Sequence, residues 1–158
     1  MSTLTVKGIE APTGFKLAMP EGHILQVVQG LNTNTLNGGF LINTTSSSYV
    51  AVPLSATITP SSTSSKILIS VAISTYRGGA GSYTIYAGGT NIGDSTHGIQ
   101  RMTGAQAYWA GESHTVLHSP NTTNAITYQL YCRSESGNFY VGGDGGVRNT
   151  ITLMEVQG

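Results

Sequence analysis

The segment GESHTVLH, residues 111–118, concentrates the residues of this chain that are most capable of chemistry. Glu112, His114 and His118 are all of types that bind zinc. On a helix the two histidines would share one face, one turn apart. On a strand they also share a face, but ~13 Å separates them at ~3.3 Å per residue, so one zinc ion with ligands at ~2 Å cannot reach both. We therefore expect no metal site in this segment.

The other reactive side chains belong to no recognisable catalytic or metal-binding motif. Cys132 is the only cysteine, so no intrachain disulfide can form, and it shares a strand face with Tyr128 and Leu130, as expected of a buried apolar thiol. Asp94 and Asp144 lie in glycine-rich loops, where Asp commonly supports turns. The run GGDGG lacks the Lys and Ser/Thr of a phosphate loop, and no GxSxG or HExxH motif occurs. We expect no enzymatic activity and no cofactor.

Composition predicts the elements that would position these residues. Charged residues make up only 9% of the chain, against roughly 25% in an average protein, and the formal net charge is zero. The chain has 17 Ser, 21 Thr and 21 Gly. Thr favours strands, whereas Ser and Gly favour turns, so we expect an all-β, turn-rich protein. Without a basic stripe, neither nucleic acid nor a membrane surface is an expected partner.

Alternation of apolar and polar residues predicts the individual strands. The segment 54–74, LSATITPSSTSSKILISVAIS, has two alternating runs joined by Pro60 and five Ser/Thr residues, which predicts a β-hairpin with one buried side. Gly88 and Gly89 predict a second, two-residue hairpin. The resulting architecture is an antiparallel, jelly-roll-like β-sandwich. The expected strands are 23–29, 40–42, 49–52, 54–59, 66–74, 82–87, 90–92, 103–110, 113–118, 126–133, 139–141 and 150–156.

Residues 1–22 differ from the β-sandwich domain expected over residues 23–158. Prolines and glycines break any regular element, yet the segment is too apolar for a free tail. We expect an extended N-terminal arm that lies on another surface, although a disordered or self-packed terminus is the alternative. No signal peptide or membrane span is apparent, which predicts synthesis in a cytoplasm without general export. The arm's candidate attachment residues are Leu4, Val6, Ile9, Phe15, Leu17 and Met19.

Aromatic residues and the scarcity of charge both bear on binding. Eight Tyr accompany three Phe and one Trp, and Tyr and Trp are enriched at interfaces. We expect Tyr83 and Tyr128 to fill the core, and Tyr108 and Trp109, in the loop-rich region 77–111, to form an exposed recognition tip. So neutral a surface favours association, which predicts assembly with copies of the chain or with a larger structure. A monomer coated with Ser and Thr is the alternative.

Five segments together resemble tailed-bacteriophage virion structural proteins of the tail-fibre and capsid-decoration type. The resemblance implies a virion component made in the host cytoplasm, often a homotrimer, and it supplies no catalytic residues. These segments, which lie between Gly22 and Val156, are GHILQVVQ, SATITPSSTSSKILISV, YTIYAGGTNIG, SPNTTNAITYQLYCRSESGN and TITLMEV.

Two virion roles follow from the resemblance. A short arm and one β-domain suit a capsid decoration (cement) protein that binds the major capsid protein and stabilises the shell, because it binds the assembled state. The alternative is a tail-fibre or receptor-binding module that recognises a host surface glycan. A carbohydrate-binding or hydrolytic β-sandwich is a third hypothesis, and it requires acids and aromatics clustered in one groove.

Overall fold

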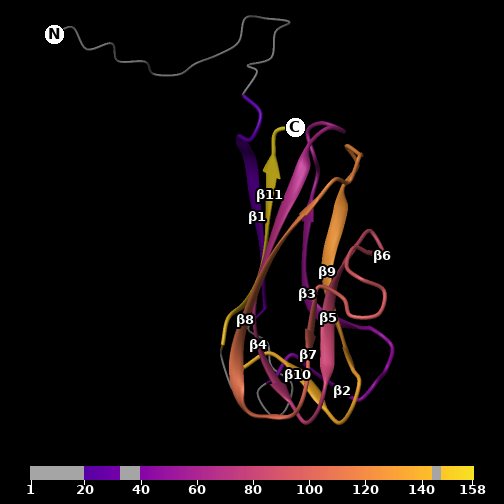
Figure 1. Ribbon diagram of the computed structural model, residues 1–158. Helices are drawn as coiled ribbons and strands as arrows, with labels where there is room; N and C mark the ends of the chain where they lie inside the picture. The colour runs from indigo at the N-terminus through magenta and orange to yellow at the C-terminus, as the bar shows by residue number, and fades with distance from the viewer. Residues whose placement is uncertain (1–19, 33–39, 144–146) are drawn as a thin grey trace, which may run out of the picture.

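Two antiparallel sheets packed face to face make up the molecule (Figure 1). The computed structural model describes residues 20–32, 40–143 and 147–158, and all regular structure within them is β. The all-β antiparallel sandwich predicted from composition and alternation is thus confirmed. Sheet A contains β1 (Ile24–Asn32), β2 (Ile42–Thr44), β4 (Lys66–Arg77), β8 (Gln106–His118), β10 (Phe139–Val141) and β11 (Asn149–Val156). Sheet B contains β3 (Val50–Ile58), β5 (Gly81–Ala87), β6 (Thr90–Asn91), β7 (Gln100–Met102) and β9 (Ile126–Ser134).

The strand order is that of a jelly roll. One edge of β4 pairs first with β11 and then with β10, so β10 and β11 together fill one strand position. β1 pairs with β11 and β2 pairs with β10, so β1 and β2 together fill the next position. The other edge of β4 pairs with β8. Sheet B runs β3-β9-β5, with β6 and β7 on the far edge of β5. Consecutive positions along the chain alternate between the sheets, except that β5 is followed in the same sheet by β6 and β7, which is the jelly-roll pattern.

The core lies between the sheets and is built by the predicted alternation. Every second residue of β4 is buried, from Ile67 to Thr75, and β3 and β11 alternate in the same way. Tyr83 and Tyr128 are fully buried, as expected, and Cys132 lies in the same core. Burial raises the pKa of the Cys132 thiol to about 12, so this thiol stays protonated and unreactive near neutral pH.

The predicted hairpin over residues 54–74 is wrong in its pairing. Its two strands exist, but β3 pairs with β9 in sheet B, whereas β4 pairs with β8, β10 and β11 in sheet A. The connection therefore crosses from one sheet to the other. Two strands with one apolar face each can bury those faces side by side or against each other, and alternation alone does not distinguish the two arrangements.

The turn predicted at Gly88 and Gly89 is confirmed, whereas the strand break predicted near Gly111 is wrong. Gly88 and Gly89 do form the two-residue hairpin between β5 and β6, with φ of 56° and 89°, as the favoured mirror-image turn requires. The break predicted between strands 103–110 and 113–118 is wrong, because β8 runs unbroken through Gly111, which pairs with Ser74 of β4. A glycine flanked by ladder pairs does not end a strand.

Candidate functional site

The histidines of β8 are bound by tyrosines of the facing sheet. Nδ1 of His114 lies 2.5 Å from the hydroxyl of Tyr83, and Nδ1 of His118 lies 2.9 Å from the hydroxyl of Tyr128. Burial lowers the pKa of His118, which keeps its imidazole neutral. Both pairs join the edge strand of sheet A to sheet B. No group of three or more potential metal ligands occurs among the described residues.

Asp94 supports a turn, as its sequence context suggested. Its Oδ1 accepts hydrogen bonds from the backbone N–H groups of His97, at 2.6 Å, and Thr96, at 2.9 Å. These two bonds hold the pKa of the Asp94 carboxyl below its usual range. Asp144, the other loop acid considered from the sequence, lies outside the described residues, as do the attachment candidates Leu4, Val6, Ile9, Phe15, Leu17 and Met19.

Tyr108 and Trp109 lie in strand β8, within the strand expected over residues 103–110. Tyr108 is 70% exposed, but Trp109 is half-buried, and their neighbouring positions send the two rings in different directions. Trp109 packs on Tyr76, with ring centroids 5.7 Å apart, and near Tyr140, at 6.4 Å. Tyr140 also contacts Tyr76, at 5.4 Å, and Phe40, at 5.1 Å. We call these four rings, Phe40, Tyr76, Trp109 and Tyr140, the aromatic band.

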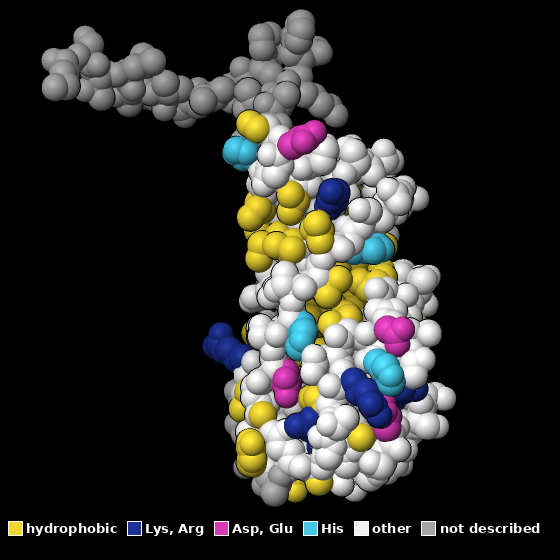
Figure 2. Space-filling model, in the orientation of Figure 1, with side chains coloured by type: hydrophobic (Ala, Val, Ile, Leu, Met, Phe, Trp, Pro, Cys, Tyr) yellow, Lys and Arg dark blue, Asp and Glu magenta, His cyan; other side chains and the backbone are white. Residues whose placement is uncertain are grey.

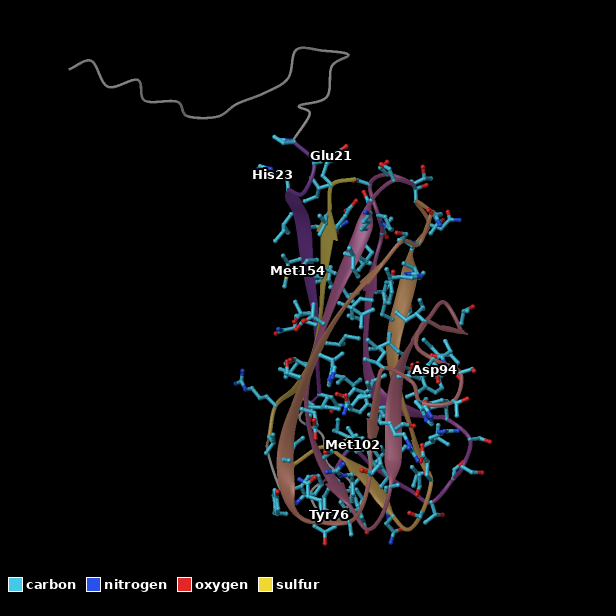
Figure 3. All side chains as sticks on the ribbon, in the orientation of Figure 1. Glu21, His23, Tyr76, Asp94, Met102 and Met154 are labelled. Carbon is cyan, nitrogen blue, oxygen red and sulfur yellow. The ribbon has the colours of Figure 1, made fainter. Side chains whose placement is uncertain are left out.

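The aromatic band is one end of a larger surface, the outer face of sheet A. Near the other end, a row of apolar side chains crosses all four strand positions. Val27 of β1 is the register partner of Met154, Met154 of Leu68, and Leu68 of Leu117 of β8. We call these four residues the apolar band. Figure 3 labels Met154 toward one end of the molecule and Tyr76 at the opposite end.

Small residues, all but one of them Ser or Thr, separate the two bands. Thr152, Ser70 and Thr115 form one row across β11, β4 and β8, and Thr150, Ala72 and Ser113 form the next. We call these two rows the hydroxyl belt. Beside it lies an open hollow of about 380 Å³, with Ala72, Ser74 and Gly111 in its lining and Val147 and Arg148 at the adjoining loop.

Charge is scarce among the described residues of this face, although Arg148 of the loop before β11 lies beside it. Glu112 and Glu155 take the inward parity of β8 and β11, and Arg77 takes the buried parity of β4, where it donates a hydrogen bond to Gln106. Among the charged residues in the six strands, only Lys66 has outward parity, at the end of β4. The charges of the other sheet are paired instead: Arg101 and Arg133 lie 2.8 and 3.3 Å from the carboxylate of Glu135.

Exposed apolar side chains gather on the strands of sheet A and the loop before β11. All six large hydrophobic residues that are substantially exposed in the described part of the chain belong to strands of sheet A or to the loop before β11. Figure 2 shows apolar side chains gathered over the region of β1. The six are Ile24 (53%), Val27 (58%), Leu31 (49%), Tyr108 (70%), Leu117 (53%) and Val147 (41%).

The sequence contained a signal for this face. In a strand with one solvent-exposed side, apolar and polar residues alternate, whereas a strand covered on both sides has consecutive apolar residues. Val27-Val28, Ile67-Leu68-Ile69, Val116-Leu117 and Leu153-Met154 are such runs, and all of them lie at the apolar band. Only the pairing of the strands brings the four outward residues into one row.

No family model matches the chain, and no curated protein matches it. The described residues contain no helix long and apolar enough to span a membrane.

Proposed function

We propose that this protein is a structural component of a tailed-bacteriophage virion, and specifically a capsid decoration protein that binds the head as a homotrimer. The observation that carries the proposal is a jelly roll with one sheet face almost free of charge. Jelly rolls are frequent in viral capsid proteins, and a neutral surface favours association. The sequence resemblance to virion proteins supports the same role.

The ends of the sandwich suit different tasks in this proposal. Residues Glu21 and His23 lie at one end, and Tyr76 lies at the other (Figure 3). Close to that first end, the backbone N–H of Gly22 donates to the carbonyl of Gln157, which anchors the start of the described chain beside its C-terminus. The arm would therefore leave from this end toward the major capsid protein. Bound across capsid subunits, the protein would stabilise the shell because it binds only the assembled state.

The decisive experiment is localisation in the virion. Gold-labelled antibody against the protein should decorate the head surface in electron micrographs. Label confined to the tail would refute decoration, and absence of label from purified particles would refute any virion role. A variant that lacks residues 1–19 should keep the circular dichroism spectrum of the full chain but fail to bind capsids. Full binding by this variant would remove the arm from the mechanism.

The aromatic band favours a second candidate, a tail-fibre module that recognises a host surface glycan. Tyr76, Trp109 and Tyr140 lie close together beside the exposed Tyr108, and aromatic rings with polar tips suit a partly wet binding surface. Binding of the purified protein to host envelope glycans, lost in Trp109→Ala and retained in a sheet B variant such as Ser55→Ala, would support this candidate over decoration.

A further inference from the structure

We infer that the outer face of sheet A is the contact surface between copies of this chain. This deepens the proposed function, on which it rests for the expectation that the protein assembles, and it names a second copy as the occupant of the face. Four observations carry the inference: the concentration of exposed apolar residues, the near-absence of charge, the hydroxyl belt, and the size of the face.

The apolar band would expose a continuous hydrophobic row in a monomer. Val27 and Leu117, at its two edges, are 58% and 53% exposed, and Ile24 and Leu31 extend the patch along β1. Scattered exposed apolar residues are ordinary, but a connected patch across a whole sheet marks an interaction site. By contrast, all the substantially exposed large apolar residues of the described chain lie outside sheet B.

The lack of charge selects the kind of partner. A charged partner surface would lose solvation against this face without gaining an opposite charge, which is unfavourable. Among the described residues, a second copy of the face brings few charges into the contact region: Lys66 at the end of β4, and Glu112 and Arg148 beside the hollow. Neutral surfaces of the same composition can therefore bury each other at the lowest electrostatic cost.

The hydroxyl belt makes the face complementary to itself. A Ser or Thr hydroxyl both donates and accepts hydrogen bonds, so Ser70, Thr115 and Thr152 of one copy can pair with the same residues of another. Carboxylates or ammonium groups in these positions would repel their own copies. The apolar band, the hydroxyl belt and the aromatic band each run across the strands at a different height along them. Two copies whose strands lie side by side can therefore bring each band of one copy against the same band of the other.

The face is large enough for a stable contact. It is four strand positions wide, and β4, with 12 residues, spans its length. At ~4.8 Å between strands and ~3.4 Å per residue, the face covers on the order of 800 Å². Stable protein–protein contacts bury about 800 Å² from each partner.

The test is the oligomeric state of the purified full chain. Light scattering behind size exclusion should give an oligomer of the 16.5 kDa chain: a dimer if the face meets the same face of one other copy, or the trimer that the resemblance implies if each copy contacts two others around a three-fold axis. The double variant Val27→Lys/Leu117→Lys places two charges on the face and should weaken association roughly 100-fold, to a monomer at micromolar concentration. The control Ser55→Lys adds a charge at an exposed position on the outer face of sheet B and should leave the oligomer intact.

Three outcomes would overturn the inference: a monomeric wild-type protein, a double variant that remains oligomeric, or a control variant that dissociates as readily as the double variant. Circular dichroism and thermal melting verify that both variants fold. If the double variant does not fold, Thr115→Lys places a charge on the same face in its stead. The experiment needs no virion. An oligomer through this face that is absent from particles would contradict the proposed function alone. A head-bound monomer would contradict this inference and the homotrimer, but it would leave the role in capsid decoration standing.

Discussion

Polar side chains inside the sandwich act as fixed links between its elements. Glu155 of β11 is fully buried, and its Oε1 accepts hydrogen bonds from the backbone N–H and the hydroxyl of Ser61, at 2.7 and 2.6 Å. Its Oε2 accepts from Gln26 of β1, at 2.6 Å. One carboxylate thus ties the connection between the sheets to the edge of sheet A. Such links cost the most when a single partner is removed.

Replacing Glu155 by Gln should lower the free energy of unfolding at neutral pH by about 2–3 kcal/mol, because an amide group presents a donor to the donors of Ser61 and Gln26. Urea denaturation measures this loss. Asn91→Gln, which disturbs an amide of the β6 loop instead, controls for a general effect of altered polar contacts. A variant as stable as the wild type would show that the carboxylate is not a structural link.

The same carboxylate predicts a dependence on acid. Burial alone raises the pKa of Glu155, but the hydrogen bonds from Ser61 and Gln26 outweigh it and hold the pKa below its usual range. A lowered pKa in the folded state stabilises the protein above the unfolded pKa of about 4.3, and this stability is lost as pH falls through the folded pKa. As pH falls from neutral to below the folded pKa of Glu155, the free energy of unfolding should therefore decrease for the wild type and change less for Glu155→Gln.

The core tyrosines predict the opposite dependence at alkaline pH. Burial raises the pKa of Tyr128 to about 12, so the neutral phenol is favoured by folding. Stability is therefore complete below the unfolded pKa of about 10 and is lost as pH rises toward the folded value. Tyr128→Phe, which also loses the bond to His118, should cost about 1 kcal/mol at neutral pH and weaken this alkaline loss.

Ultraviolet titration of tyrosinate provides the check for Tyr128. One absorbance step near the alkaline end should vanish in Tyr128→Phe. Tyr108→Phe, at a position that is 70% exposed, should keep this step and leave stability unchanged. Equal effects of the two variants would contradict the assignment.

At the scale of elements, the jelly roll depends on how closely its strands approach. Gly30 of β1 faces the other sheet, and a Cβ atom there would lie 2.0 Å from the backbone carbonyl oxygen of Ser55 in β3. Backbone cannot move aside as a flexible side chain can, so glycine is required at this crossing. Gly111 of β8, in contrast, has open space where a Cβ atom would lie.

Gly30→Ala should therefore lower the free energy of unfolding by about 3 kcal/mol, at the upper end of overpacking effects, because β1 and β3 must separate to admit the methyl group. Gly111→Ala is the matched control and should leave stability unchanged or slightly raised, since Gly weakens strands by roughly 0.5–1 kcal/mol relative to Ala. Denaturant midpoints of the two variants give the comparison. Equal midpoints would show that the approach of β1 to β3 is not limiting.

At the scale of the whole molecule, charge and apolar surface are separated between the two sheets. Sheet B carries the ion-paired cluster around Glu135, whereas sheet A presents the apolar band, the hydroxyl belt and the aromatic band. A sandwich with this division has one side suited to solvent and one suited to a neutral partner. The proposed assembly follows from this division and not from any single residue.

Assembly through an uncharged face should resist salt. Raising the ionic strength from about 0.15 M to about 1 M shortens the Debye length from ~8 to ~3 Å, which weakens charged contacts but not apolar ones. Sedimentation equilibrium should therefore give a dissociation constant that is unchanged or lower at high salt, and lower still in sulfate. A dissociation constant that rises tenfold or more would indicate a charged interface and contradict the proposed face.

Alternation in the sequence was sufficient to predict the β class, most strands and the buried positions. The parity of Ile67 and Ile69, the burial of Tyr83 and Tyr128, and the turn at Gly88 all depend on residues close in the chain. Such local patterns reflect local geometry, which each segment imposes on itself.

Only the tertiary structure decided which strands are partners and what their outer sides build together. The alternation in segment 54–74 is compatible with a hairpin and with a connection that crosses between the sheets. The sequence around Trp109 is likewise compatible with a loop or a strand. The sequence likewise contains Val27, Leu68, Leu117 and Met154 as separate residues with consecutive apolar neighbours. Their single row depends on register between strands far apart in the chain, because hydrogen-bonded pairing, and not side-chain alternation, sets which residues lie opposite one another.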